Sequence, residues 1–119
     1  MAPFGATCVL LYSAPQSPLS QPANVVGGHV LSALIGLVLA SLLPTEWWAV
    51  ALAVGGAITL MALCRVTHPP AGASPIIVFA LQPDFDFLLF PVLLGALLMV
   101  LSATLFHRLS KTAYPIEQA

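Results

Sequence analysis

Charged side chains are scarce in this sequence. Only three of its 119 residues are Lys or Arg and four are Asp or Glu, whereas 60% are hydrophobic. A soluble domain carries about a quarter charged residues and places them on the outer faces of its helices. Here no charge occurs before Glu46, and long apolar runs separate most of the later ones. The sequence therefore predicts a protein embedded in lipid rather than a soluble domain.

Other absences argue against nucleic-acid binding, metal or cofactor sites and enzymatic activity. The net charge of −1 provides no basic surface for nucleic acid, so we expect no such partner. Cys8 and Cys64 lie in apolar runs without metal-ligand spacing and are interpreted as small apolar side chains. The three histidines form no pair four residues apart, so we expect neither a metal nor a cofactor. No nucleophile–base pair or carboxylate pair lies within the apolar runs, which argues against an enzyme.

The apolar runs predict an all-α membrane protein. Spanning the hydrocarbon core takes roughly 20 helical residues. Three stretches are long enough: about Asn24 to Leu43, about Glu46 to Arg65 and about Phe87 to His107. Asn24 is a candidate N-cap for the first. Two shorter pieces, Pro3 to Ala14 and His68 to Leu81, open with Pro and Gly. They are too short to span and predict two half-helices, each entered through a non-helical segment.

The two short pieces resemble each other. A shift of 67 residues places Pro3, Gly5, Ala6 and Thr7 on Pro70, Gly72, Ala73 and Ser74. The shared pattern is P-x-G-A-[ST], then an apolar run, a turn and a long helix with an early glycine. We interpret it as a duplication within one transmembrane domain at 1–112, with units at about 1–43 and 46–108 and a tail at 113–119.

Basic residues near helix ends predict the orientation. Arg65, Arg108 and Lys111 favour the cytoplasmic side, which makes the C-terminus cytoplasmic and the chain a multi-pass protein of the cell (inner) membrane. The two units then have opposite orientations, as in the inverted repeats of many transporters. A re-entrant path for residues 66–86 would instead make the repeat parallel. The duplication also predicts another spanning helix upstream of Met1, which this chain lacks.

The region from Arg65 to Ser74 carries the strongest local signal. Pro69 and Pro70 remove two backbone donors and hold the chain extended, which leaves the backbone bonds of Thr67 and Ala71 open. A half-helix starting near Gly72 would then aim free N–H groups at this spot, a geometry that favours anions.

The predicted site also includes donors and charges from both units. Its remaining members are Arg65, Thr67, His68, Ala73 and Ser74, the opposing Gly5, Ala6 and Thr7 of the first unit, and His29. In a purely structural alternative, Pro and Gly make a tight reversal. His68 then bonds a nearby carbonyl, and Arg65 extends to the membrane interface.

Small residues recur every fourth position in two of the long stretches. They are Gly28, Ser32, Gly36 and Ala40 in the first, and Ala49, Ala53 and Ala57 in the second. Such stripes let neighbouring helices approach closely, within one protomer or between protomers. Because so few spans rarely enclose a pathway alone, we expect a homo-oligomer.

The sequence resembles the HPP family of integral membrane proteins, named for the motif at His68-Pro69-Pro70. The stretches Pro3-Phe4-Gly5-Ala6-Thr7, Gln21-Pro22 and Asn24-Val25-Val26-Gly27-Gly28-His29 are also similar to this family. The resemblance covers Pro3 to about Leu105 and implies a multi-pass protein. Plastid and cyanobacterial relatives are linked to nitrite transport, and some bacterial relatives carry a cytosolic CBS-domain pair. The first family helix is missing here.

Two functions remain open at this stage. The first is a channel or transporter for a small inorganic anion, possibly nitrite, bound between the two half-helix starts near His68. The second is a non-transporting membrane anchor or sensor that works with a cytosolic regulatory partner of the CBS type. In both, membrane lipid surrounds the protein.

Overall fold

The structure is a computed structural model that describes residues 1–118, and all regular elements within that range are helical. The helices are α1 (Ala2–Ser13), α2 (Pro22–Leu42), α3 (Trp47–Leu63), α4 (Ser74–Leu81) and α5 (Leu94–Leu109). Four short helical segments join them: η1 (Pro18–Ser20), η2 (Pro69–Ala73), η3 (Phe85–Leu88) and η4 (Leu89–Leu93).

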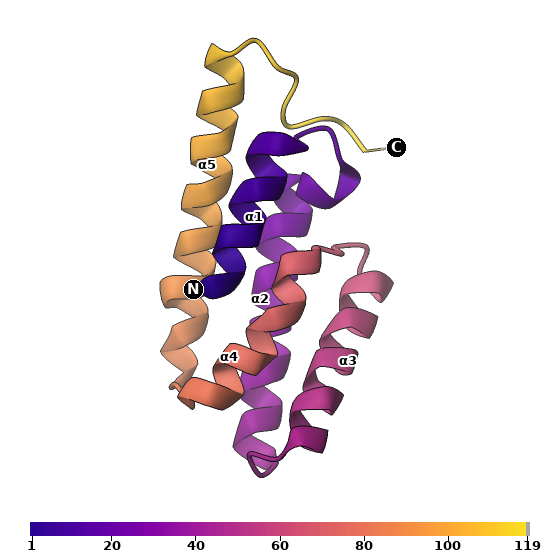
Figure 1. Ribbon diagram of the computed structural model, residues 1–119, viewed down its shortest axis with the longest axis vertical. Coiled ribbons are helices and arrows are strands. Elements are labelled where there is room, and N and C mark those ends of the chain that lie inside the picture. Colours follow the sequence, from indigo (N-terminus) through magenta and orange to yellow (C-terminus); the bar gives the residue numbers. More distant parts are fainter. Residues whose placement is uncertain (119) are drawn as a thin grey trace.

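The molecule is elongated, with α2 and α5 along its length (Figure 1). It measures 48 Å along the longest axis, close to the roughly 40–45 Å of a bilayer with its headgroups. Helices α1 and α4 are short and both begin near the middle of this axis (Figure 1). From there α1 runs toward one end and α4 toward the other, and α2 and α5 are likewise antiparallel. Helix α1 contacts η2, the short segment that directly precedes α4.

Two helices, not three, are long enough to span a membrane. They are α2, with 21 residues, and the η3–η4–α5 rod from Phe85 to Leu109, with 25. The prediction of a third long helix is wrong, because α3 has 17 residues and ends at Leu63. Arg65 adopts a left-handed φ of 57°, and the Val66 N–H bonds the Met61 carbonyl. This is a Schellman cap, which terminates the helix two residues earlier than the sequence suggested.

The last rod is also less regular than predicted. Phe90 is extended, with φ −137° and ψ 119°, so the helix is interrupted there. The cause is Pro91, whose ring disfavours a helical conformation of the preceding residue. Regular α-helix resumes only at Leu94. Asn24, expected as an N-cap, instead lies inside α2, which begins at Pro22 after Gln21.

Small residues form the inner faces of α2 and α3. Ala49, Ala53 and Ala57 are fully buried. In α2, a Cβ added at Gly36 would lie 3.0 Å from the Cα of Pro75, so α4 packs directly on the glycine backbone. The interpretation of these stripes as packing faces is confirmed, and they operate within the protomer.

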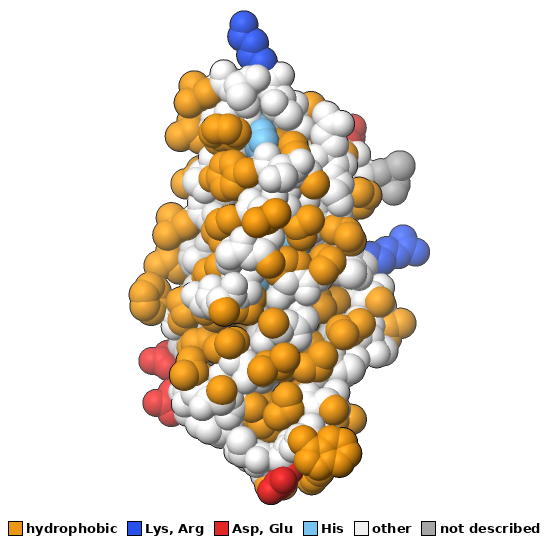
Figure 2. Space-filling model, viewed as in Figure 1, with side chains coloured by type: hydrophobic (Ala, Val, Ile, Leu, Met, Phe, Trp, Pro, Cys, Tyr) orange, Lys and Arg blue, Asp and Glu red, His pale blue; other side chains and the backbone are white. Residues whose placement is uncertain are grey.

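The outer surface is apolar over most of the molecule (Figure 2). Large exposed side chains cover α5 in particular, including Leu97, Leu98, Leu101 and Leu105. The few charged side chains in this view lie at the two ends and on the two flanks. A soluble protein rarely exposes so continuous an apolar surface, whereas hydrocarbon chains solvate it well.

Candidate functional site

Three of the predicted site residues meet in the centre of the molecule. The Thr7 hydroxyl of α1 lies 2.8 Å from His29 Nε2 of α2 and 2.9 Å from His68 Nε2. All three side chains are fully buried. We refer to Thr7, His29 and His68 as the central cluster. It joins the first half-helix to the His-Pro-Pro segment, as the sequence predicted for residues near these two helix starts.

The hydrogen-bond partners of the central cluster assign its protons when both rings are neutral. His68 Nδ1 lies 2.8 Å from the Leu19 carbonyl, which only accepts, so Nδ1 carries the hydrogen. His68 Nε2 then accepts from the Thr7 hydroxyl, and Thr7 accepts from His29 Nε2–H. This leaves the lone pair of His29 Nδ1 buried without a partner. The bond to Leu19 matches the structural alternative for His68.

Gly28 makes room for the His-Pro-Pro segment beside α2. A Cβ at this position would lie 2.7 Å from the Cβ of His68 and 3.0 Å from the Val66 carbonyl oxygen. Real side chains do not approach so closely. The sequence identified Gly28 as part of a packing stripe and of the motif ending at His29, but not as a site residue. Its position directly before His29 was the available signal for a role at the site.

Side chains of α2 also bond two carbonyl groups of the His-Pro-Pro region. Asn24 Nδ2 donates to the Thr67 carbonyl at 2.9 Å, and Ser32 Oγ donates to the Ala71 carbonyl at 2.6 Å. The expectation that the backbone of Thr67 and Ala71 remains open is therefore wrong for their carbonyl oxygens. Asn24 supplies a donor for the Thr67 carbonyl.

The prediction that Pro69 and Pro70 hold the chain extended is wrong beyond His68, because Pro69–Ala73 form the 3₁₀ helix η2. Within it the Ala71 N–H bonds the His68 carbonyl, and the Ser74 N–H bonds the Ala71 carbonyl.

The other predicted site residues lie farther from the polar centre. Gly5, Ala6, Pro69 and Arg65 are exposed, Thr67, Gly72 and Ala73 are half-buried, and Pro70 and Ser74 are buried. Gly72 has ample space, since a Cβ there would meet only Ile58 Cγ1 at 3.9 Å. Arg65 forms the cap of α3 on the surface instead of joining the central cluster.

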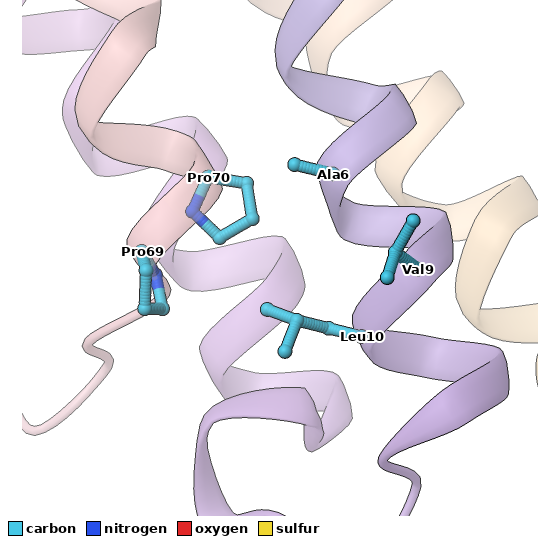
Figure 3. A pocket seen from close by; sticks show the side chains of 5 residues that line it. All are labelled: Ala6, Val9, Leu10, Pro69 and Pro70. Carbon is cyan, nitrogen blue, oxygen red and sulfur yellow. The ribbon is translucent and has the colours of Figure 1, made fainter.

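A pocket of about 490 Å³ separates α1 from the His-Pro-Pro segment. Ala6, Val9 and Leu10 line one wall, and Pro69 and Pro70 face them across the gap (Figure 3). All five side chains are apolar, whereas the sequence suggested a polar pocket at this place. Ala6 and Pro69 are the chain neighbours of Thr7 and His68, so the pocket lies directly beside the central cluster.

Ser74 is a second buried polar group without a partner. Its side chain begins α4 and is fully buried, and its Oγ has no hydrogen-bond partner among the described residues. Most buried hydroxyls in proteins are hydrogen-bonded, because an unsatisfied one costs about 1–3 kcal/mol. An unsatisfied hydroxyl donor is a suitable contact for an anion. The backbone here adds little, because the Ser74 N–H bonds the Ala71 carbonyl and Pro75 has no N–H.

The C-terminal tail packs against the turn that holds His68. Tyr114 donates its hydroxyl to the Ser20 carbonyl at 3.0 Å, and the Ile116 N–H donates to Gln21 Oε1 at 2.9 Å. Burial raises the pKa of Tyr114 to about 12, so the phenol stays neutral at physiological pH. The tail predicted at 113–119 is thus an ordered strap as far as Gln118, and residue 119 lies outside the described range.

Removing the Tyr114 hydroxyl should loosen this strap. Tyr114→Phe is expected to lower the free energy of unfolding by about 1 kcal/mol, because the buried Ser20 carbonyl loses its donor. Hydrogen exchange should accelerate at residues 110–118 and 18–21. Tyr12→Phe is the matched control, since the Tyr12 hydroxyl bonds Ser102 on the exposed surface. Equal exchange in the two variants would contradict a structural role for the strap.

Comparison with known proteins agrees with the apolar surface and the His-Pro-Pro architecture. Residues 1–115 match the family described as "HPP, transmembrane region". Two curated transmembrane proteins of Dictyostelium discoideum are 38% and 37% identical to 95% of this chain, which covers 43% and 39% of their lengths. The chain thus spans about two fifths of these relatives, and no solved structure matches it. The match over nearly the whole chain shows that this protein belongs to the HPP transmembrane family of membrane proteins.

Proposed function

We propose that this protein conducts a small inorganic anion across its membrane, with nitrite as the leading candidate. The observation that carries the proposal is that two of the three buried, unpartnered polar atoms, His29 Nδ1 and Ser74 Oγ, belong to predicted site residues, in a chain whose two short helices start near mid-depth. The third, His107 Nδ1, lies in α5. Unpaired polar atoms are rare in a membrane interior and are retained where they contact a ligand.

The arrangement of the elements supports an inverted repeat around this region. Adding 67 to the bounds of α2, Pro22–Leu42, gives 89–109, the range that η4 and α5 cover. The same shift moves α1 onto η2 and α4, and η1 onto η3, within one residue at each end. The opposite directions of α1 and α4 (Figure 1) support a relation of the two units by inversion along the long axis.

The two units also exchange close contacts. Gly28 of the first long helix accommodates His68, at the start of the second unit's half-helix. At the position 67 residues later, Gly95 accommodates Phe4, at the start of the first unit's half-helix, with a Cβ there overlapping the Phe4 ring. Each glycine is in close contact with a residue near the start of the other unit's half-helix, as expected of two halves that enclose a shared site.

The anion in this proposal lies between the starts of α1 and α4. The Ser74 hydroxyl would donate to it, and Thr7 lies at the corresponding position of α1. The proposal includes a homo-oligomer, a multi-pass arrangement in the cell membrane and a cytoplasmic C-terminal end of α5. The anchor or sensor function with a cytosolic regulatory domain is the alternative, and absence of flux would favour it.

Ser74→Ala tests the proposed site without endangering the fold. The variant removes an unsatisfied buried hydroxyl, so its free energy of unfolding should equal or exceed that of the wild type. Nitrite influx into proteoliposomes should nevertheless fall about tenfold, the effect of losing one hydrogen bond of about 1.4 kcal/mol to a charged ligand. Ser41→Ala, which changes an exposed serine at the end of α2, is the control. Unchanged influx in Ser74→Ala would rule out this site.

A further inference from the structure

The Thr7 hydroxyl has three hydrogen-bond neighbours but only one hydrogen. They are His29 Nε2 at 2.8 Å, His68 Nε2 at 2.9 Å and the Pro3 carbonyl oxygen at 3.2 Å. A hydroxyl donates once and accepts through two lone pairs. The Pro3 carbonyl only accepts, whereas each imidazole nitrogen donates or accepts according to its protonation state. With His68 Nδ1–H bonded to Leu19, the central cluster has two arrangements that satisfy Thr7.

The two arrangements differ by one proton. In the neutral arrangement Thr7 donates to His68 Nε2. In the cationic arrangement His68 carries hydrogens on both nitrogens, Nε2–H donates to Thr7, and the Thr7 hydroxyl turns to the Pro3 carbonyl. His29 Nε2–H donates to Thr7 in both. The change needs only rotation about the Cβ–Oγ bond of Thr7, and each N–H and O–H retains an acceptor.

We propose that His68 is a proton-binding site with Thr7 as its hydroxyl switch, and that the bound proton crosses the membrane together with the anion. The second half of this inference rests on the proposed function; the first half does not. The proton comes from water on one side, adds to the Nε2 lone pair of His68, and returns to water on the other side. His29 is the poorer carrier, because a proton on its Nδ1 has no acceptor among the described residues.

The charges around His68 explain why a proton there favours an anion. The titratable group facing it is His29, with ring centroids 5.1 Å apart, and a positive charge on one ring disfavours a second on the other. The packed segments of α2, η1 and η2 place neutral groups against it, and Arg65 is exposed. All four carboxylates, Glu46, Asp84, Asp86 and Glu117, are also exposed. A buried imidazolium thus lacks a counter-ion, and a bound anion would supply one.

Anion and proton therefore assist each other's binding. An anion that stabilises the imidazolium raises the proton affinity of His68, and by linkage the proton raises the anion affinity by the same factor. The geometry predicts that Thr7→Val weakens proton binding, because the Nε2–H of protonated His68 loses its acceptor. Thr7→Ser keeps the hydroxyl and should behave as the wild type. Thr59→Val makes the same chemical change at an exposed threonine of α3 and is the control.

Nitrogen-15 NMR of histidine in the full chain, reconstituted in lipid nanodiscs, tests the proton site directly. His68 should titrate between an Nδ1–H neutral form and an imidazolium, and nitrite should raise its midpoint. Thr7→Val should lower the midpoint by about one pH unit or more, the size expected when a charged donor loses its acceptor. A His68 midpoint that is identical in wild type and Thr7→Val would overturn the proton site.

Proton movement in proteoliposomes tests the coupling. A nitrite gradient should acidify the lumen, as reported by a trapped pH dye, in wild type and Thr59→Val and less than one tenth as fast in Thr7→Val. Nitrite influx that leaves the lumenal pH unchanged would overturn the coupling while the proposed function stands. Absence of nitrite influx in the wild type would overturn the proposed function and the coupling with it. The NMR titration then still decides the proton site.

Discussion

Gly28→Ala should destabilise the protein by about 2–3 kcal/mol and displace the His-Pro-Pro segment from α2. The new methyl group would lie 2.7 Å from the Cβ of His68 and 3.0 Å from the Val66 carbonyl oxygen. Neither atom is the free end of a flexible side chain, so relief requires the backbone of residues 66–68 to move. The gain in helix propensity from Gly to Ala, about 1 kcal/mol, does not offset this clash.

The displacement should also break the central cluster. His68 is held by Thr7 at 2.9 Å and by Leu19 at 2.8 Å, and a shift of an ångström lengthens both bonds beyond useful range. Nitrite influx should therefore be lost along with stability. Reversible unfolding in mixed micelles measures the first effect, and proteoliposome influx measures the second.

Gly55→Ala is the matched control for this experiment. Gly55 also lies within an apolar helix, but a Cβ there meets nothing within 4 Å. The substitution should be neutral or stabilise α3 by up to about 1 kcal/mol. Equal free energies of unfolding for Gly28→Ala and Gly55→Ala would contradict the close packing of the His-Pro-Pro segment on Gly28 of α2.

His68→Ala should abolish nitrite influx and lower the free energy of unfolding by about 2–4 kcal/mol. The variant leaves the Leu19 carbonyl without its donor, removes one partner of Thr7 and opens a cavity at a fully buried position. Hydrogen bonds between membrane helices contribute modestly, about 0.6 kcal/mol on average, so much of the loss comes from the cavity.

Comparison of His107→Ala with His68→Ala separates the effect of losing the anion site from the effect of losing stability. His107 is also buried, and its Nε2 lies 2.8 Å from the Leu11 carbonyl, but it belongs to α5 and is not in the central cluster. The variant should be destabilised to a comparable degree and still admit nitrite at the wild-type rate per folded protein. Equal loss of influx in both variants would mean that His68 matters only for folding.

Local sequence patterns predicted the elements well where backbone chemistry decides them. Proline and glycine at the start of each short piece produced α1 and the η2–α4 pair, within one residue of the expected ends. The prediction of a third long helix was wrong because the end of α3 depends on Arg65 in a left-handed conformation, which glycine usually adopts. No local pattern distinguishes such an arginine from one that continues a helix.

The sequence named Thr7, His29 and His68 among a larger set of candidate site residues, but it did not predict their geometry. Thr7 and His68 are 61 residues apart, and their contact depends on the path of α2 between them. The partners Leu19, Asn24 and Ser32 were not assigned to the site, because their bonds to residues 67–71 form only when the helices are packed. The pocket beside the cluster is lined by apolar side chains, which the motif alone did not suggest.

By itself, the sequence determined that this protein resides in lipid, is helical and starts its two short helical pieces at about Pro3 and Pro69–Pro70. Those properties follow from scarce charge and from proline's missing N–H, and both act without reference to distant residues. Tertiary structure alone decided that Thr7, His29 and His68 share one hydrogen-bonded cluster and that two spans rather than three are long. In a chain so uniformly apolar, hydrophobicity does not select which helix faces meet. The faces that meet are selected by close packing at small residues such as Gly28 and by hydrogen bonds to buried polar groups.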